Sequence, residues 1–336
     1  MRTPEYLSYS SLSLLEKNPE DFYTQRLAEV RPPREPQSQP MAVGSAFDAY
    51  AKAALHAALF GSGADPRYEF DAIFVSQVEE HNRDFGLEAG KHVFDAYNFC
   101  GAYGHLLKEL HQSVESPRFE FTVKGLIGGV PFQGKPDCRL VLDFGEGLIP
   151  CIYDWKVRGY CSKYTTSPTK GYAICLDCFE APKQNRSHGK EHSLYLAKSF
   201  RGLTINAGYF ETCSSNYADQ LCLYGWLLDE TPGDENIVLG IEEFVAKPSK
   251  EEGKPPQLRF ARHRALCKKE YQLGLLERVK TAWDRINSGH FFTELSREDS
   301  EDRCKLLEDV SASMCEGDGS ELDQWFADAT RDPYRG

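Results

Sequence analysis

The chain has 336 residues, of which 27% are charged and 41% are hydrophobic, so it can bury a sizeable core as one large domain or two smaller ones. No apolar run approaches the ~20 residues of a membrane span, and the N-terminus lacks the charged-then-apolar pattern of a secretion signal. These features favour a cytoplasmic protein that does not enter a membrane. The eleven cysteines are odd in number and scattered, which favours reduced thiols over a disulfide framework.

The formal net charge of −12 is unevenly distributed along the chain. Residues 290–336 contain thirteen acidic and five basic residues and so form an acidic extension. Residues 157–201 contain eight Lys or Arg and three acidic residues, which makes this segment locally basic. The overall charge therefore does not exclude nucleic acid as a partner, because the distribution of charge matters more than its sum.

Helical and strand patterns alternate along the chain. An alanine-rich helix is predicted over residues 43–55 and carries Asp48. Two or more helices are predicted within residues 69–113, and an alternating pattern predicts a strand over residues 119–123. The other predicted elements are a helical pair within residues 6–27, a helix that begins near Ser214, strands over 236–246 and 257–266, a long amphipathic helix over 268–287, and a short helix around 304–310.

The most informative stretch is residues 134–156. Two apolar runs flank Phe144-Gly145-Glu146-Gly147, whose glycines suit the positive φ of a tight turn, so the stretch predicts an antiparallel hairpin. Asp137 stands at the start of the first strand, and Asp154 and Lys156 stand at the end of the second. Residues two apart in a strand point to the same face. Two carboxylates and a lysine are therefore expected to converge.

Oxygen ligands of this kind suit Mg²⁺ or Mn²⁺, which keep several waters and are usually completed by substrate phosphate. A nearby lysine could position or help deprotonate a water, and this chemistry favours phosphodiester hydrolysis. The alternative is a solvated strand end, which is the usual setting of charged residues. The helix after Ser214 carries Gln220 and Tyr224 at i and i+4, hence on one face, although Tyr224 also suits a half-buried core position.

Five short motifs follow one another in the order found in the PD-(D/E)XK nuclease superfamily. They are Leu7 to Leu12 with Asn18-Pro19, Gly44 to Asp48, Gly134-Lys135-Pro136-Asp137, Asp154-Trp155-Lys156, and Gln220 to Tyr224. Over roughly residues 6–290 the chain resembles the RecB-like branch of this superfamily, which includes phage-type exonucleases. The resemblance implies an α/β fold with a restriction-endonuclease-like core, in which a central mixed β-sheet is flanked by helices.

The resemblance also implies roles for individual residues. Asp137 and Asp154 would be metal ligands, with the backbone carbonyl of Trp155 assisting, and Lys156 would orient the attacking water. The Gln220 and Tyr224 pair would lie beside the site and help to fix the lysine or the DNA strand.

Two acidic residues match the family less closely. The family often has a histidine metal ligand four residues after the glycine, and Asp48 occupies that position here. Oxygen can replace imidazole on Mg²⁺, so Asp48 is a candidate ligand. Glu120 matches a family acidic position loosely, and an outward glutamate on an edge strand is the alternative. Some relatives hold an iron–sulfur cluster that uses an early cysteine; Asn18 occupies that place here, so no cluster is expected.

The basic segment 157–201 contains a Cys/His pattern that fits tetrahedral zinc, although its gap is shorter than that of a zinc finger. The candidate zinc ligands are Cys161, Cys175, Cys178, His188 and His192. The alternatives are a loop that contacts DNA with solvated histidines, or a plain solvated surface. Basic residues in this segment suit contact with DNA phosphates; the candidates are Arg158, Lys163, Lys170, Lys183, Arg186 and Lys190.

We therefore predict a nuclease-like domain over residues 1–290, with a basic insertion at 157–201 and an acidic extension at 291–336. The expected activity is Mg²⁺- or Mn²⁺-dependent hydrolysis of DNA by an exonuclease of phage or bacterial DNA processing or recombination. A recombination or replication protein is a candidate partner. A structure- or sequence-specific endonuclease of the same fold, and an inactive DNA-binding or assembly module, are the alternatives.

Overall fold

The computed structural model describes residues 2–143, 145, 147–162, 198–200, 203–205, 215–230, 237–247, 257–265 and 269–316. The chain divides into two compact units. The first comprises Met1–Glu35, Lys124–Gly134 and Leu273–Gly336, and the second comprises Pro36–Val123 and Lys135–Gln272. The domain boundary predicted at residue 290 stays a prediction.

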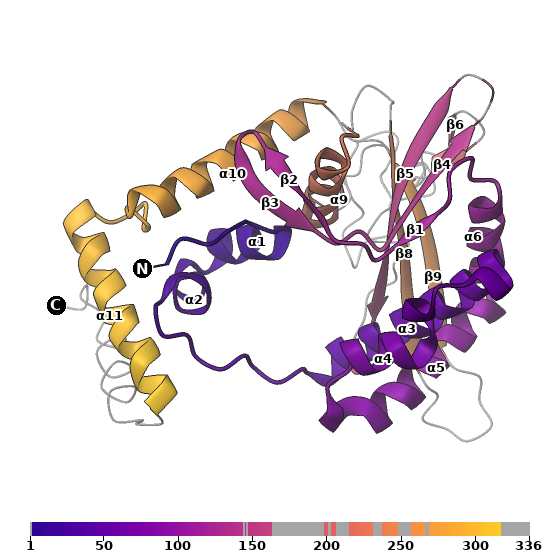
Figure 1. Cartoon of the computed structure of the whole chain (residues 1–336), viewed down its shortest axis with the longest axis horizontal. Coiled ribbons are helices and arrows are strands. Elements are labelled where there is room, and N and C mark those ends of the chain that lie inside the picture. The colour runs from indigo at the N-terminus through magenta and orange to yellow at the C-terminus, as the bar shows by residue number, and fades with distance from the viewer. Residues whose placement is uncertain are drawn as a thin grey trace, which may run out of the picture. The chain divides into compact units, whose positions relative to one another are not determined.

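The second unit contains the main sheet (Figure 1). Its helices are α3 (Gln39–Phe60), α4 (Phe70–Gln77), α5 (Arg83–Phe99), α6 (Ala102–His111) and α9 (Ser215–Leu227). Its strands are β1 (Arg118–Phe119), β4 (Cys138–Asp143), β5 (Leu148–Arg158), β6 (Lys198–Phe200), β7 (Leu203–Ile205), β8 (Val238–Lys247) and β9 (Gln257–Ala265). Apart from the strand expected over residues 119–123, the helices and strands predicted for these regions are thus present, with α3 longer at both ends than predicted.

Five strands form the main sheet in the order β1-β4-β5-β8-β9. β5 and β8 run parallel, and the other neighbouring pairs are antiparallel. The predicted mixed sheet is therefore confirmed. Parallel neighbours need a crossover connection, and the segment between β5 and β8 contains α9.

The predicted hairpin is also confirmed. β4 pairs with β5 from Cys138 opposite Tyr153 to Asp143 opposite Leu148. Gly145 has a φ of 84°, which glycine adopts without steric cost. Because β5 continues to Arg158 and β4 begins only at Cys138, part of β5 extends beyond the end of its partner.

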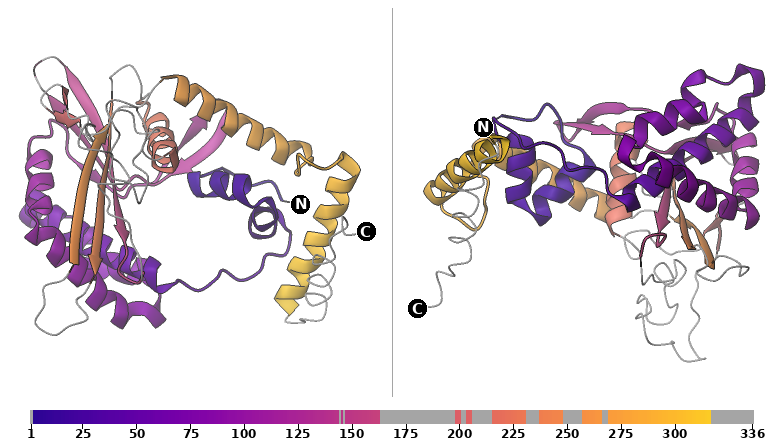
Figure 2. Two further views of the ribbon diagram at one scale, coloured as in Figure 1. Left: turned by 180° about the vertical axis from the view of Figure 1, so that it is seen from behind. Right: turned by 90° about the horizontal axis from the view of Figure 1, so that it is seen from below.

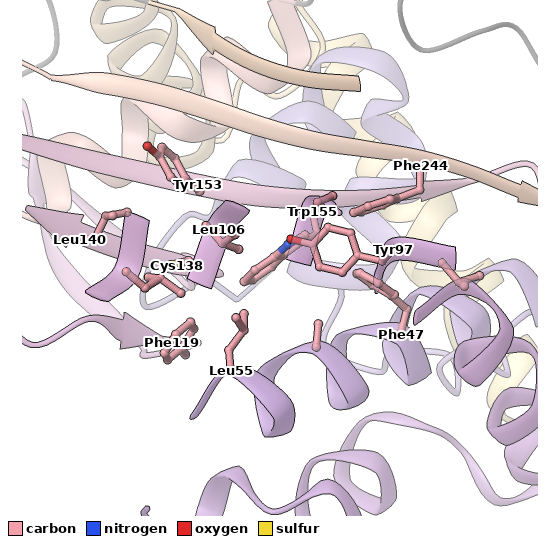
Figure 3. Close-up of a cluster of buried hydrophobic side chains, with 14 of the residues drawn as sticks. Phe47, Leu55, Tyr97, Leu106, Phe119, Cys138, Leu140, Tyr153, Trp155 and Phe244 are labelled. Atoms are coloured by element: carbon pink, nitrogen blue, oxygen red, sulfur yellow. The ribbon is translucent and has the colours of Figure 1, made fainter. Parts of the chain in front are cut away.

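Helices cover both faces of this sheet (Figures 1 and 2). α3, α5 and α6 lie on one face and α9 lies on the other. The first face holds the main core, where Phe47, Tyr97, Trp155 and Phe244 come together (Figure 3). The ring centroids of Tyr97 and Phe244 are 4.7 Å apart in an edge-to-face arrangement, which is a favourable aromatic geometry. The packed face therefore fixes the orientation of β5 and β8.

A buried ionic network reinforces the same face. Glu242 of β8 is fully buried and accepts hydrogen bonds from Tyr97 Oη at 2.5 Å and Arg262 Nε at 2.8 Å. Arg264 Nη2 donates to Glu242 at 3.0 Å, and its guanidinium lies 3.6 Å from the ring centroid of Tyr153. Buried charges are tolerated only when they are paired, so this network ties β8 and β9 to α5 and β5 in one register.

The first unit is built mainly from helices. It contains α1 (Tyr9–Lys17), α2 (Pro19–Phe22), a π-helical turn (Tyr23–Leu27), β3 (Val130–Gly134), α11 (Arg297–Glu316), and most of β2 (Val123–Ile127) and α10 (Lys269–Ser288). Phe22 stacks on Phe291, with ring centroids 5.7 Å apart. The helix predicted around 304–310 is present and is longer than expected. It is α11, which has 20 residues and includes the buried Leu307 and Val310. No helix in the described ranges is long and apolar enough to cross a membrane.

The prediction of a single strand over residues 119–123 is wrong. β1 ends at Phe119, and β2 begins only at Val123. Between them Glu120 has a φ of +40°, a left-handed conformation that interrupts an extended strand. The Glu120 N–H donates to the Asp137 carbonyl at 3.1 Å, which holds this break beside the start of β4.

α3 and α5 approach each other closely at Gly90. A Cβ atom added there would lie 2.5 Å from Ala46 Cβ and 2.8 Å from the Ala46 carbonyl carbon. We expect Gly90→Ala to lower the free energy of unfolding by about 1–3 kcal/mol, because two helix backbones must move apart. Urea denaturation of the wild type and the variant measures this change.

Gly104, an exposed residue of α6, provides the matched control. A Cβ atom there meets nothing within 4 Å. Alanine is the better helix former, so Gly104→Ala should raise the free energy of unfolding by about 0.5–1 kcal/mol. Equal effects of the two substitutions would contradict the close crossing at Gly90.

Candidate active site

The pleat of β5 divides its side chains between the two faces of the sheet. Tyr153 and Trp155 belong to the core beside α3 and α5 (Figure 3), so Asp154 and Lys156 point to the opposite face. The Lys156 ammonium forms an ion pair with Asp154 Oδ2, and Asp154 is only 3% exposed. The structure thus places these two residues on one face, as the spacing predicts.

Asp137 lies immediately before β4, beside the part of β5 that extends past its partner. Asp137 Oδ2 accepts a hydrogen bond from the Trp155 N–H at 3.2 Å. The N–H and C=O groups of one strand residue point to the same side, so the Trp155 carbonyl is directed toward this edge as well. The structure therefore brings the predicted acidic pair together.

The two carboxyl groups have pKa values that are shifted in opposite directions. Burial and the neighbouring Asp137 raise the pKa of Asp154 well above its usual range. Burial also acts to raise the pKa of Asp137, but Lys52, the hydrogen bond with Asp154 and the charge of Lys156 lower it to about 2. The pair therefore carries its negative charge mainly on Asp137.

α9 supplies the groups that hold Lys156. Lys156 Nζ donates to Gln220 Oε1 at 3.2 Å, and Gln220 Nε2 donates to Tyr224 Oη at 2.9 Å. Lys156 Nζ also lies 5.2 Å from the ring centroid of Tyr217, a cation–π distance. Burial acts to lower the pKa of Lys156, but Asp154 and Asp137 raise it above its ordinary value, so the side chain is an ammonium.

Tyr224 belongs both to the core and to the site. It is 7% exposed, and burial raises its pKa to about 12. Its hydroxyl nevertheless contacts Gln220, so the predicted alignment of the two residues on one helix face is confirmed.

Asp48 and Glu120 both contact Lys52, a lysine of α3. Lys52 Nζ lies 2.5 Å from Asp48 Oδ2, 2.8 Å from Glu120 Oε2 and 3.6 Å from Asp137 Oδ1. Burial raises the pKa of Asp48 to about 7, although Lys52 opposes this change. The pKa of Glu120 is lowered, because Lys52 and Lys135 outweigh the opposite effect of burial. The predicted acidic residues thus gather around a cation that the chain itself supplies.

Three residues of this cluster were not predicted to be functional. Lys52 stands four residues after Asp48 on one helix, so helical spacing could have indicated it. Gln77 Nε2 donates to Glu120 Oε2 at 2.7 Å and to Asp48 Oδ2 at 3.2 Å, and Lys135 forms an ion pair with Glu120. Gln77 gives no local signal, because its partners are 29 and 43 residues away in the sequence.

Within the described ranges, no group of three or more His, Cys, Asp or Glu side chains is arranged to hold a metal ion. The Asp137 and Asp154 pair still suits one. Asp154 Oδ2 is buried and, apart from its ion pair with Lys156, receives no directed hydrogen bond. Mg²⁺ is commonly bound through one or two carboxylates, with waters and substrate phosphates as the other ligands. These two carboxyl groups and the Trp155 carbonyl therefore fit Mg²⁺ or Mn²⁺.

Two of the candidate zinc and DNA-binding residues in the predicted basic insertion, Arg158 and Cys161, lie within the described ranges. Arg158 is half exposed, and its Nη1 lies 2.7 Å from Oε1 of the buried Glu243, the parallel-strand neighbour of Lys156. Cys161 is an exposed free cysteine. The other zinc and DNA-binding candidates lie outside the described residues: Lys163, Lys170, Cys175, Cys178, Lys183, Arg186, His188, Lys190 and His192.

The chain is similar to a solved structure of a candidate exonuclease from Eubacterium rectale, with 14% sequence identity, 85% of this chain and 82% of that chain covered, and a TM-score of 0.38. No curated protein sequence matches significantly.

The family model of the PD-(D/E)XK nuclease superfamily matches residues 6–172. This region includes both carboxylates of the hairpin, Lys156 and the Lys52 cluster. The mixed sheet flanked by helices is the restriction-endonuclease-like core expected of such proteins. The chain therefore belongs to the PD-(D/E)XK nuclease superfamily.

Proposed function

We propose that this chain is a metal-dependent deoxyribonuclease that removes nucleotides from DNA ends during phage or bacterial DNA processing or recombination. The observation that carries the proposal is the convergence of Asp137, Asp154 and Lys156 at one edge of the sheet. Membership of a nuclease superfamily supports phosphodiester hydrolysis. The resemblance of the motifs to RecB-like exonucleases supports action at DNA ends.

Asp137, Asp154 and the Trp155 carbonyl would hold Mg²⁺ or Mn²⁺. When bound, the ion supplies Lewis acidity that neutralises charge on the scissile phosphate and activates water for in-line attack. The Trp155 N–H keeps the Asp137 carboxylate directed toward this edge of the sheet. The hairpin therefore positions the acidic groups before substrate arrives.

Lys156 acts as a cation and a hydrogen-bond donor, because its pKa is raised and the amine stays protonated. It can orient the attacking water and stabilise the negative charge that develops on the phosphate. Gln220 and the Tyr217 ring restrict the positions that its flexible side chain adopts. Such positioning lowers the entropic cost of reaching the transition state.

The first test is digestion of linear and closed-circular DNA with Mg²⁺, Mn²⁺ or EDTA. We expect metal-dependent loss of linear DNA only. Lys156→Ala and Asp154→Asn should each reduce the rate by at least about 10²-fold, since the first removes a preorganised positive charge and the second removes a carboxyl group that would hold the metal ion. The exposed i,i+4 pair of Lys91 and Asp95 on α5 provides the matched controls, and Lys91→Ala and Asp95→Asn should cleave at the wild-type rate.

Cleavage of closed-circular DNA would instead identify an endonuclease of the same fold. DNA binding without cleavage under every metal condition would identify a binding or assembly module and refute the proposal. Unchanged cleavage by Lys156→Ala would show that a different site performs the chemistry.

A second test addresses the support that α9 gives to Lys156. Gln220→Ala should lower kcat by about 10–100-fold, the usual cost of losing a residue that orients a catalytic group. The KM for DNA should change little, because Gln220 contacts the lysine and not the bulk of the substrate. Gln112→Ala, at an exposed residue after α6, serves as the control. A rise of about 10–100-fold in KM with an unchanged kcat would instead assign Gln220 to DNA binding.

A further inference from the structure

Lys52 is an unusual residue for a buried position. It lies in the middle of α3, and its side chain is 1% exposed. Lysine is almost never fully buried unless it is paired, because removing an ammonium group from water costs several kcal/mol. Three carboxyl groups compensate for that burial here, and they come from α3, from the break between β1 and β2, and from the start of β4.

The carboxylate oxygens of Asp48 and Glu120 that face Lys52 accept several hydrogen bonds from protein donors. Asp48 Oδ2 and Glu120 Oε2 each receive a hydrogen bond from Lys52 and another from Gln77. Lys135 pairs with the other oxygen of Glu120. Asp154 lies on the other side of Asp137, where its Oδ2 forms an ion pair with Lys156 and receives no further directed hydrogen bond from the described residues. The Lys52 side is therefore held by donors from several elements, whereas the described contacts of Asp154 Oδ2 leave only Lys156 on the other side.

Asp137 is shared between the two sides. Its Oδ1 lies 3.6 Å from Lys52 Nζ, while its Oδ2 receives the Trp155 N–H beside Asp154. In two-metal phosphodiesterases a carboxylate commonly lies between two cations that are about 3.5–4 Å apart. In this chain the ammonium group of Lys52 lies on one side of the Asp137 carboxylate.

We propose that Lys52 is a built-in cation that takes the place of a second divalent metal ion, so that the site binds a single ion at Asp137 and Asp154. Asp48 and Glu120 then hold Lys52 and do not ligate the metal. This inference rests on the proposed function and specifies its metal content. Lys52 acts as a positioning residue, because it reaches the reaction through Asp137.

The test is a titration of the full-length protein with Mn²⁺, followed by calorimetry and by electron paramagnetic resonance. We expect the wild type to bind one Mn²⁺ and to show the spectrum of an isolated ion. In Lys52→Met the three carboxyl groups lose their cation, so a second Mn²⁺ should bind. Because the two ions would share Asp137, their spins should couple.

Two further variants control for charge and for general effects of substitution. Lys52→Arg keeps the positive charge and should still bind one Mn²⁺. Lys91→Met, which breaks an exposed i,i+4 pair on α5, should also bind one. These numbers of bound ions do not change if Lys52 merely supports the fold.

Binding of two Mn²⁺ by the wild type would overturn the inference, and this result does not require the variants to fold. Binding of a single Mn²⁺ by folded Lys52→Met would overturn it as well. If the wild type cleaves DNA while binding two ions, the proposed function stands and only the inference fails. If the wild type neither binds Mn²⁺ nor cleaves DNA, both fail.

Discussion

The alternation of side chains along β5 is the constraint on which the site depends. Tyr153 and Trp155 are large and belong to the core. Because side chains alternate along a strand, Asp154 and Lys156 lie on the other face of the sheet. A shift of one residue in the register of β5 would exchange the two sets and bury both charges among aromatic rings. The hydrophobic effect therefore positions Asp154 and Lys156, although neither residue is hydrophobic.

The Lys52 cluster shows how a fold can hold several charges away from water. Each group alone would be costly to bury, and removing one partner from a buried ionic cluster typically costs about 3–5 kcal/mol. The cluster joins α3, α4 and the residues that precede β4, so it also stabilises the arrangement of these elements. The same oxygens thus support the fold and hold Lys52 beside Asp137.

The sequence was most informative where signals are local. The hairpin, the shared face of Asp154 and Lys156, and the alignment of Gln220 with Tyr224 follow from periods of two and about four residues. The break at Glu120 was missed because its neighbours alternate like a strand, while its left-handed backbone depends on a hydrogen bond to Asp137. The role of Gln77 was missed because tertiary packing alone brings it to the acidic residues.

The parallel pairing of β5 with β8 has a consequence for synthesis on the ribosome. The hairpin that carries both carboxylates emerges early, but α9 and β8 emerge much later. Strands that are distant in sequence pair slowly, because a long loop must be closed before their contacts form. A partly translated chain therefore carries the acidic residues without the helix that orients Lys156. Asp154 and Lys156 can therefore reach their final arrangement only after residues up to Lys247 have left the ribosome.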